Sequence, residues 1–186
     1  MEIWILVALA VTAAVVSVFI YNRLVSLRQA ARQAFADIDV QLRQRADLVP
    51  NLVNVVKGYA QHETGTLESV MKARAATQNA GSHADAAAAD TLMTAALGRL
   101  FAVAEAYPDL KASANFAQLQ TELGDVENKI AAARRFLNSA VAEYNAAIEQ
   151  FPAVIFANAF GFKPDTMFTI GAEARERESA TPFVSF

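Results

Sequence analysis

Few side chains in this sequence have the types and spacing that a chemical site requires. The two histidines, His62 and His83, each lie beside an expected turn, and His62-Glu63 does not begin a zinc-binding HExxH motif because Thr66 stands where its second histidine belongs. The chain has no cysteine, which excludes disulfides and thiol catalysis. Neither a glycine-rich phosphate loop nor a GxSxG nucleophile elbow occurs. We therefore expect no catalytic residue, no cofactor and no metal site, and we do not expect an enzyme.

A polar ladder is the better defined feature. Asp39, Arg43, Asp47 and Asn51 are spaced by four, so they stack along one face of a helix. Asp39 precedes Arg43 in the order that favours an ion pair between residues four apart. A second ladder, formed by Asp37, Gln41 and Arg45, runs beside the first. The favoured interpretation is a solvated face stabilised by such pairs, and the alternative is a surface that holds a partner.

Pro50 interrupts the same helical stretch. Its ring nitrogen cannot donate to the carbonyl of Ala46, and a proline inside a helix costs about 3 kcal/mol. Two interpretations remain open. A kink that lets the helix wrap around its neighbours is favoured, and the alternative is that a side chain satisfies the freed carbonyl, with Asn51 and Asn54 as local donors.

The elements that must position these residues are helices. Of the 186 residues 54% are hydrophobic, while glycine (7) and proline (5) are scarce. No stretch alternates apolar and polar residues for long enough to predict a sheet. The 16 basic and 19 acidic residues are interspersed and give a net charge of -3, so we expect no nucleic-acid partner. The fold class predicted is all-α.

Residues 1–21 are predicted to form a transmembrane anchor. Residues 3–20 contain no charge, glycine or proline and would extend about 27 Å as a helix, enough to cross the lipid bilayer. Trp4 and Tyr21 stand at the two ends, where aromatic rings favour the interface. Basic residues follow the run rather than precede it, which disfavours a cleaved signal peptide. A buried core helix is the other alternative.

The charges also predict an orientation. Arg23, Arg28 and Arg32 follow the apolar run, so the N-terminus should be outside and the rest cytoplasmic, with a single pass through the inner (plasma) membrane of the cell. No glycine or proline occurs from residue 1 to residue 49, so the membrane helix is expected to continue into the next domain as a rigid stalk.

Residues 22–162 are predicted to form an antiparallel bundle of three long helices plus a short C-terminal helix. Helical apolar stripes with steps of three and four support it. The first comprises Leu24, Leu27, Ala31, Ala34, Ile38, Leu42, Val49, Leu52 and Val56, and a later one, which predicts coiled-coil-like packing, comprises Phe116, Leu119, Leu123, Val126, Ile130, Ala133, Leu137, Ala140, Tyr144, Ala147 and Phe151.

The sequence offers two positions for the first interhelix turn. A break at Gly65 gives nearly equal segments, 21–62, 66–107 and 111–151, which favours it for an up-down-up bundle. The alternative places the turn at the polar cluster NAGSHAD, residues 79–85, and makes the first helix longer. Under the favoured scheme this cluster interrupts the middle helix or loops out of it.

The last part of the chain changes character. The stretch FPAVIFANAFGF, residues 151–162, predicts a short apolar helix that stops at Gly161. The favoured interpretation is that its side chains cap the end of the bundle, and the alternative is an apolar patch that awaits a partner or another copy. Residues 163–186 are expected to form an irregular tail.

Long blocks of the chain closely resemble the LemA family of bacterial membrane proteins. They are YNRLVSLRQAARQAFADIDVQLRQRADLVPNLVNVVKGYAQHE, LGRLFAVAEAYPDLKASANFAQLQTELGDVENKIAAARRFLNSAVAEYN, FP…FGFKP and the terminal Val-x-Phe. The chain departs from the family at Leu137-Asn138, where the family usually has Tyr-Asn. The resemblance implies a single N-terminal membrane helix, a helical bundle and no established enzymatic activity or cofactor. Acids and bases in the matching blocks could pair across helices, and one hypothesis pairs Glu127 with Arg43 or Arg45.

The function expected is that of a membrane-anchored scaffold or adaptor that acts through protein–protein contacts and self-associates as a homo-oligomer. Its partner would be another membrane or cytoplasmic protein. The first alternative is an oligomeric membrane-organising protein, since alanines in the anchor permit close helix contact. The less favoured alternative is a ligand-binding protein or an enzyme with an unrecognised site. The candidate contact surface comprises Asp39, Arg43, Asp47, Asn51, Phe156, Phe160 and Phe162.

Overall fold

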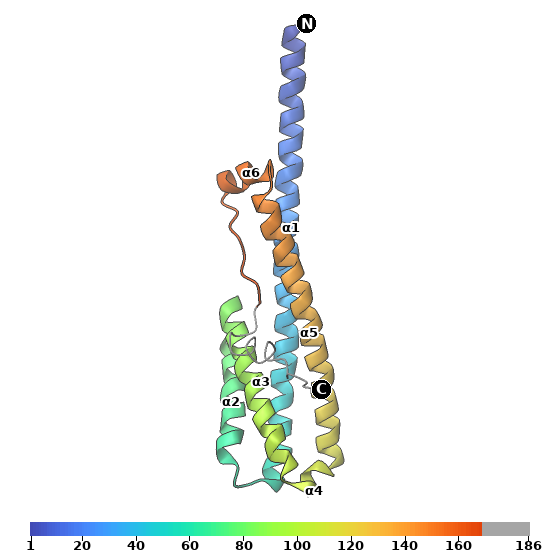
Figure 1. Ribbon diagram of the computed structural model, residues 1–186, viewed down its shortest axis with the longest axis vertical. Coiled ribbons are helices and arrows are strands. Elements are labelled where there is room, and N and C mark those ends of the chain that lie inside the picture. The colour runs from blue at the N-terminus through green and yellow to red at the C-terminus, as the bar shows by residue number, and fades with distance from the viewer. Residues whose placement is uncertain (169–186) are drawn as a thin grey trace, which may run out of the picture. The chain divides into compact units, whose positions relative to one another are not determined.

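The computed structural model describes residues 1–168 and consists of helices joined by short connections (Figure 1). In chain order they are α1 (Glu2–Tyr59), α2 (Thr64–Asn79), α3 (His83–Glu105), α4 (Pro108–Lys111), α5 (Ala114–Glu149) and α6 (Ala153–Phe160). No strand occurs within residues 1–168, so the all-α prediction is confirmed. Most of the predicted irregular tail, residues 169–186, lies outside the described residues.

The described chain divides into two compact units. One contains Met1–Ala36 and Arg135–Met167, and the other contains Asp37–Arg134 and Phe168. Helices α1 and α5 each contribute a segment to both. We call these the anchor unit and the bundle unit and describe each by itself.

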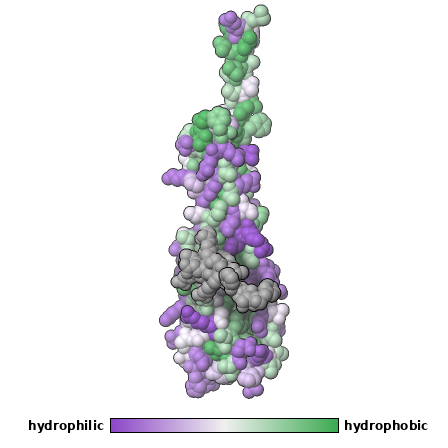
Figure 2. Space-filling view, viewed as in Figure 1, coloured by the Kyte–Doolittle hydropathy of each residue, from purple (hydrophilic) through white to green (hydrophobic). Residues whose placement is uncertain are grey.

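Helix α1 continues without a break from Glu2 to Tyr59. The absence of glycine and proline from residue 1 to residue 49 predicted this continuity for the first part of the helix. The predicted apolar stripe lies inside, because Leu24, Ala31, Ala34, Ile38, Leu42, Val49, Leu52 and Val56 are all buried, and Leu27 is half-buried. The apolar run before this stripe has a different environment. Residues 3–16 are exposed throughout, and they form the green N-terminal part of the surface in Figure 2.

The prediction of one long middle helix, and so of a bundle of three long helices, is wrong. Helices α2 and α3 are separate and pack against each other as an antiparallel hairpin joined at residues 80–82 (Figure 1). The Ser82 hydroxyl oxygen accepts the backbone N–H of Asp85 at 3.1 Å and so caps α3. The cap supplies a true helix start inside NAGSHAD. Equal segment lengths had favoured a mere interruption there.

The first interhelix turn lies near the favoured position, though not at it. Helix α1 ends at Tyr59, and the turn occupies residues 60–63. Gly65 itself belongs to the first turn of α2. Both places considered from the sequence are therefore turns.

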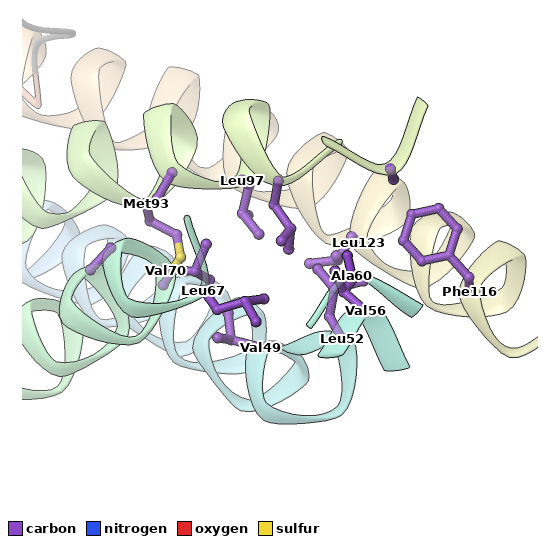
Figure 3. Packing of buried hydrophobic residues seen from close by; sticks show 14 of the residues in the cluster. Val49, Leu52, Val56, Ala60, Leu67, Val70, Met93, Leu97, Phe116 and Leu123 are labelled. Atoms are coloured by element: carbon purple, nitrogen blue, oxygen red, sulfur yellow. The ribbon is translucent and has the colours of Figure 1, made fainter. Parts of the chain in front are cut away.

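A hydrophobic core lies within the bundle unit. Val49, Leu52 and Val56 of α1 meet Leu67 and Val70 of α2, and Figure 3 shows them converging with side chains of the other helices. Those contributed by α3, α4 and α5 include Met93, Leu97, Leu100, Leu110, Phe116 and Leu123. Four long segments, from α1, α2, α3 and α5, thus share this core.

A smaller core holds the anchor unit together. Leu24 of α1, Tyr144 and Ile148 of α5, and Ala157 of α6 are buried in it together with Phe162. Helix α6 lies within the predicted stretch 151–162 and ends at Phe160. Gly161 caps it with a left-handed φ of 70°, a conformation that glycine adopts without a steric cost. The predicted stop signal is confirmed.

Candidate functional site

The polar ladder of α1 lies on the surface of the bundle unit. Arg43 Nε donates to Asp39 Oδ2 at 2.8 Å, which confirms the predicted ion pair. Asp47 and Asn51 continue the same face and are exposed. These four candidate residues therefore lie where a partner can reach them, and their role as a contact surface stays a prediction.

The second ladder does not share this environment. Asp37 is exposed, but Arg45 is completely buried, with a side-chain exposure of 0%. The prediction that Arg45 lies on a solvated face is therefore wrong. The physical reason is its position: Arg45 falls between Leu42 and Val49 at steps of three and four, on the same stripe as the apolar core residues.

Arg45 forms ion pairs with carboxylates of two other helices. Its Nη2 donates to Asp90 Oδ1 of α3 at 2.7 Å, and its Nη1 donates to Glu127 Oε1 of α5 at 2.8 Å. The hydroxyl of Thr94 accepts a longer bond of 3.3 Å from Nη1. The hypothesis that Glu127 pairs with Arg43 or Arg45 is thus settled in favour of Arg45.

Arg134 completes this network from α5. Its Nη2 donates to Asp90 Oδ2, so both oxygens of that buried carboxylate are occupied. The guanidinium of Arg134 also lies 5.4 Å from the ring centre of Phe168. Two cations and two anions balance, and each carboxylate is bound by at least one guanidinium. The network therefore links α1, α3 and α5 through charged hydrogen bonds.

The carbonyl that Pro50 frees also has a partner. Arg74 Nε of α2 donates to the carbonyl oxygen of Ala46 at 3.0 Å. A side chain therefore satisfies this carbonyl, as the less favoured interpretation held, but the donor comes from α2 and not from Asn51 or Asn54. Helix α1 continues past Pro50 for another nine residues, to Tyr59.

An amide-lined groove lies beside the end of the polar ladder. Asn51 and Asn54 of α1 face Asn115 and Gln118 of α5 across a cavity of about 440 Å³. Each carboxamide offers both donors and an acceptor, the combination that pairs with an exposed peptide backbone. Val55, Leu119 and Glu122 complete the lining. Asn51 is thus part of a concave polar surface that the ladder alone did not reveal.

A second cavity of the bundle unit is mainly apolar. It measures about 530 Å³ and lies between the last turns of α1 and helix α2, lined by Val53, Lys57, Thr64, Leu67, Glu68, Met71, Lys72 and Ala75. Nothing in the described chain fills it. Among residues 1–168, no three histidine, aspartate or glutamate side chains gather as a metal-binding group.

The three phenylalanines of the candidate surface have different environments in the anchor unit. Phe162 is buried, with the Arg28 guanidinium 4.8 Å from its ring centre. Phe156 is half-buried and Phe160 is 60% exposed, its ring edge against Tyr21 at a centroid distance of 5.1 Å. The capping interpretation thus describes Phe162, whereas Phe160 remains on the surface.

Hydrogen bonds fasten the segment after α6 to α5. The Tyr144 hydroxyl donates to the carbonyl of Lys163 at 2.9 Å, and the Asn145 side chain exchanges two bonds of 2.9 Å with the backbone of Asp165. Burial raises the pKa of Tyr144, with Asp165 adding to the rise and Arg28 and Arg32 opposing it. This attachment fixes α6 within the anchor unit.

Comparison with known proteins places these features in a family. The model of the LemA family matches residues 34–186. Among curated proteins, magnetosome protein MamQ of Magnetospirillum gryphiswaldense is 27% identical over 169 residues, which cover 77% of this chain and 62% of MamQ. Magnetosome proteins MamQ 1 and MamQ 2 of Paramagnetospirillum magneticum are 28% identical with the same coverage. The chain therefore spans less than two thirds of the length of these relatives.

Proposed function

We propose that this chain, which belongs to the LemA family, is a membrane-anchored scaffold or adaptor that acts through protein–protein contacts. One observation carries the proposal. Helix α1 contains an 18-residue apolar window of which no part is buried within the protein. Exposure of so long an apolar run to water is unfavourable, whereas its insertion into a bilayer is favourable. Each Leu, Ile, Val or Phe near the bilayer centre contributes about -0.3 to -0.6 kcal/mol to the free energy of insertion. Helix α3 is also long and apolar enough to cross a membrane, but 39% of its window is buried, so residues 3–20 are the span that the proposal assigns.

The orientation follows from the charges that flank this span. Arg23, Arg28 and Arg32 lie on α1 directly after it, and basic residues stay on the cytoplasmic side of the inner membrane. The bundle is accordingly cytoplasmic and the N-terminus is outside.

The contact surface that best fits a partner is the polar ladder with the amide-lined groove. The groove is concave and carries four carboxamides, and the ladder beside it carries both signs of charge. A polar segment of another membrane or cytoplasmic protein can find its backbone hydrogen bonds in this groove. No catalytic step is assigned to it, because the buried acids and bases are already paired with one another.

A second candidate function is that of an oligomeric membrane-organising protein. Ala8, Ala10, Ala13 and Ala14 are exposed on the span, and small residues let membrane helices approach closely. Self-association through this face would array many bundles along one patch of membrane. The adaptor is preferred because the groove supplies a concave polar surface on the bundle itself.

Site-specific photocrosslinking in intact membranes tests the adaptor. A photoreactive phenylalanine analogue replaces Asn54 in the groove, and the matched control carries the same analogue at Gln78, which is exposed on α2. The adaptor predicts one dominant foreign protein attached at position 54 and none at position 78. Adducts only between copies of the chain favour the membrane-organising alternative. Equal, non-specific adducts at both positions contradict a dedicated contact surface.

A further inference from the structure

We propose that α6 and the turn before it form a second membrane contact, which lies on the bilayer surface and inserts the side chains of Phe151, Ile155 and Phe160 among the lipid headgroups. The inference deepens the proposed function and rests on the membrane span assigned there. The occupant of this apolar surface is the lipid interface itself. Neither the family match nor the names of the relatives assigns any role to this helix.

The first support is the exposure of large apolar side chains. Phe151 is 81% exposed, Phe160 is 60% exposed and Ile155 is 57% exposed, although they are only nine residues apart in sequence. Helix α6 is attached to the rest of the anchor unit through Ala157, which is buried in its core. Residues 150–162 carry no charge. The exposed side of α6 therefore has the composition of a surface that water does not solvate well.

The second support is the position of α6 along α1. The ring of Phe160 contacts Tyr21, and Ile20 packs against the core that holds Ala157 and Phe162. Residues 20 and 21 are where the charge-free run of α1 ends. Figure 1 shows α6 beside α1 and directed across the axis of that helix. A helix at this level, directed across the span, lies in the plane of the interface and not in the hydrocarbon core.

The third support is the chemistry around the patch. Tyr21 and the exposed phenylalanines are aromatic residues of the kind that collect at headgroup level. Arg23 and Lys163 are exposed, and the guanidinium of Arg28 lies over the ring of Phe162. Cations near Tyr21 and Phe162 would attract anionic headgroups. Apolar side chains of such helices enter about 5–10 Å into the headgroup boundary.

A second copy of the chain fits this patch less well than lipid does. A stable protein interface uses roughly 20–30 residues on each side, and the patch offers three large side chains, two on a helix of eight residues and one in the turn before it. The bilayer needs no complementary shape, and the span assigned to residues 3–20 already brings it to this level.

Depth-dependent fluorescence quenching tests the proposal. The full chain carries one tryptophan, Trp4, and a Trp4→Phe background removes it. Ile155→Trp then reports on α6, Val11→Trp on the middle of the span, and Leu92→Trp on α3 as a matched control, since Leu92 and Ile155 are both 57% exposed. Each variant is reconstituted in vesicles of phosphatidylcholine and phosphatidylglycerol whose acyl chains are brominated either near the headgroup or near the methyl end.

The expected pattern is specific to each position. Lipids brominated near the headgroup quench Ile155→Trp most strongly, lipids brominated near the methyl end quench Val11→Trp most strongly, and neither lipid quenches Leu92→Trp. If Val11→Trp is quenched while Ile155→Trp behaves like Leu92→Trp, the inference is overturned and the span stands. If Val11→Trp is not quenched either, the proposed span itself fails, and the inference fails with it.

A cysteine variant separates lipid from a second copy. The chain has no native cysteine, so Ile155→Cys introduces one reactive thiol. The proposal expects this variant to remain free of interchain disulfides in the same vesicles after mild oxidation. Complete disulfide formation between copies, together with an unquenched Ile155→Trp, would assign the patch to self-association and overturn the proposal.

Discussion

Arg45 shows how a charge is accommodated inside this bundle. Its guanidinium is removed from water, and two carboxylates from different helices replace that water at 2.7 and 2.8 Å. Such a network contributes little net stability compared with an apolar core, but the loss of one member leaves an uncompensated buried charge. We infer that its role is to fix which helices meet.

Removal of the central carboxylate should therefore be costly. Asp90→Asn keeps the shape of the side chain but leaves Arg45 and Arg134 without their shared anion, and we expect the free energy of unfolding to fall by about 3–5 kcal/mol. Asp39→Asn, which breaks only the exposed pair with Arg43, should cost about 0.2–1 kcal/mol. Denaturant unfolding of the full chain in detergent micelles, followed by circular dichroism, measures both. Equal losses in the two variants would refute the structural role of the network.

The burial of Tyr144 should make the anchor unit less stable at alkaline pH. Burial raises its pKa above the ordinary value of 10.0, so the folded state keeps the phenolic proton to a higher pH than the unfolded state does. This contribution is fully present below pH 10.0 and is lost as the pH rises through the folded pKa. Thermal unfolding measured across this range should show the loss in the native chain.

The control for this prediction is Tyr144→Phe, which cannot titrate. It also loses the hydrogen bond to the Lys163 carbonyl, so it should be less stable at neutral pH yet depend less on pH above 10.0. The absorbance difference between the two proteins isolates the titration of Tyr144. A midpoint at or below pH 10.0 would show that burial does not act as described.

Both buried charges could have been recognised from their positions in the sequence. Arg45 continues the step pattern between Leu42 and Val49, and Asp90 does the same between Ala86 and Met93. A charged residue on an apolar stripe indicates a buried partner of opposite sign. The pattern does not reveal which partner, since the choice between Asp90 and Glu127 depends on how α3 and α5 are placed around α1.

At the scale of single helices, α1 is the most predictable element and Pro50 its exception. The buried stripe of α1 follows from the 3.6-residue period of its apolar residues. Its continuity follows from a sequence with a single glycine, Gly58, which lies next to the end of the helix. The proline is tolerated because a donor from α2, Arg74, replaces the missing backbone N–H. A contact between two helices thus decides the conformation of one of them, and a reading of α1 alone could not find it.

A double-mutant cycle tests this compensation. Arg74→Met keeps the apolar stem but leaves the buried Ala46 carbonyl without a donor, and we expect a loss of about 1–3 kcal/mol in the free energy of unfolding. In a Pro50→Ala background, the new N–H of residue 50 can bond that carbonyl, so the same Arg74→Met change should cost clearly less. Chemical denaturation of the four proteins gives the coupling energy. An identical cost in both backgrounds would mean that Arg74 acts through some other contact.

The hairpin of α2 and α3 shows where length arguments fail. Equal segments favoured one middle helix, yet Ser82 and Asp85 form a local cap that starts a new helix at His83. The cap was visible as a Ser followed by an Asp three residues later. Both α2 and α3 also contribute apolar side chains to the core of the bundle unit, so each helix of the hairpin is held there by packing.

At the scale of the whole molecule, the apolar residues of the bundle unit and those of residues 3–16 differ in their burial. The bundle unit buries its apolar stripes, while residues 3–16 expose theirs. This contrast was predictable from the charge-free run. The apolar stretch 151–162 was also visible in the sequence, but which of its side chains stay exposed was not, and neither was the groove beside Asn51, because both depend on which residues come together in space.

The most direct test of the central claim, a single membrane span with a cytoplasmic bundle, is cysteine accessibility. Because the native chain has no cysteine, Glu2→Cys and Gln78→Cys each carry one thiol, and both positions are exposed. We predict that a membrane-impermeant maleimide labels Glu2→Cys in intact spheroplasts and labels Gln78→Cys only after the membrane is opened. Labelling of Gln78→Cys in intact spheroplasts, or its recovery in the soluble fraction, would contradict the account.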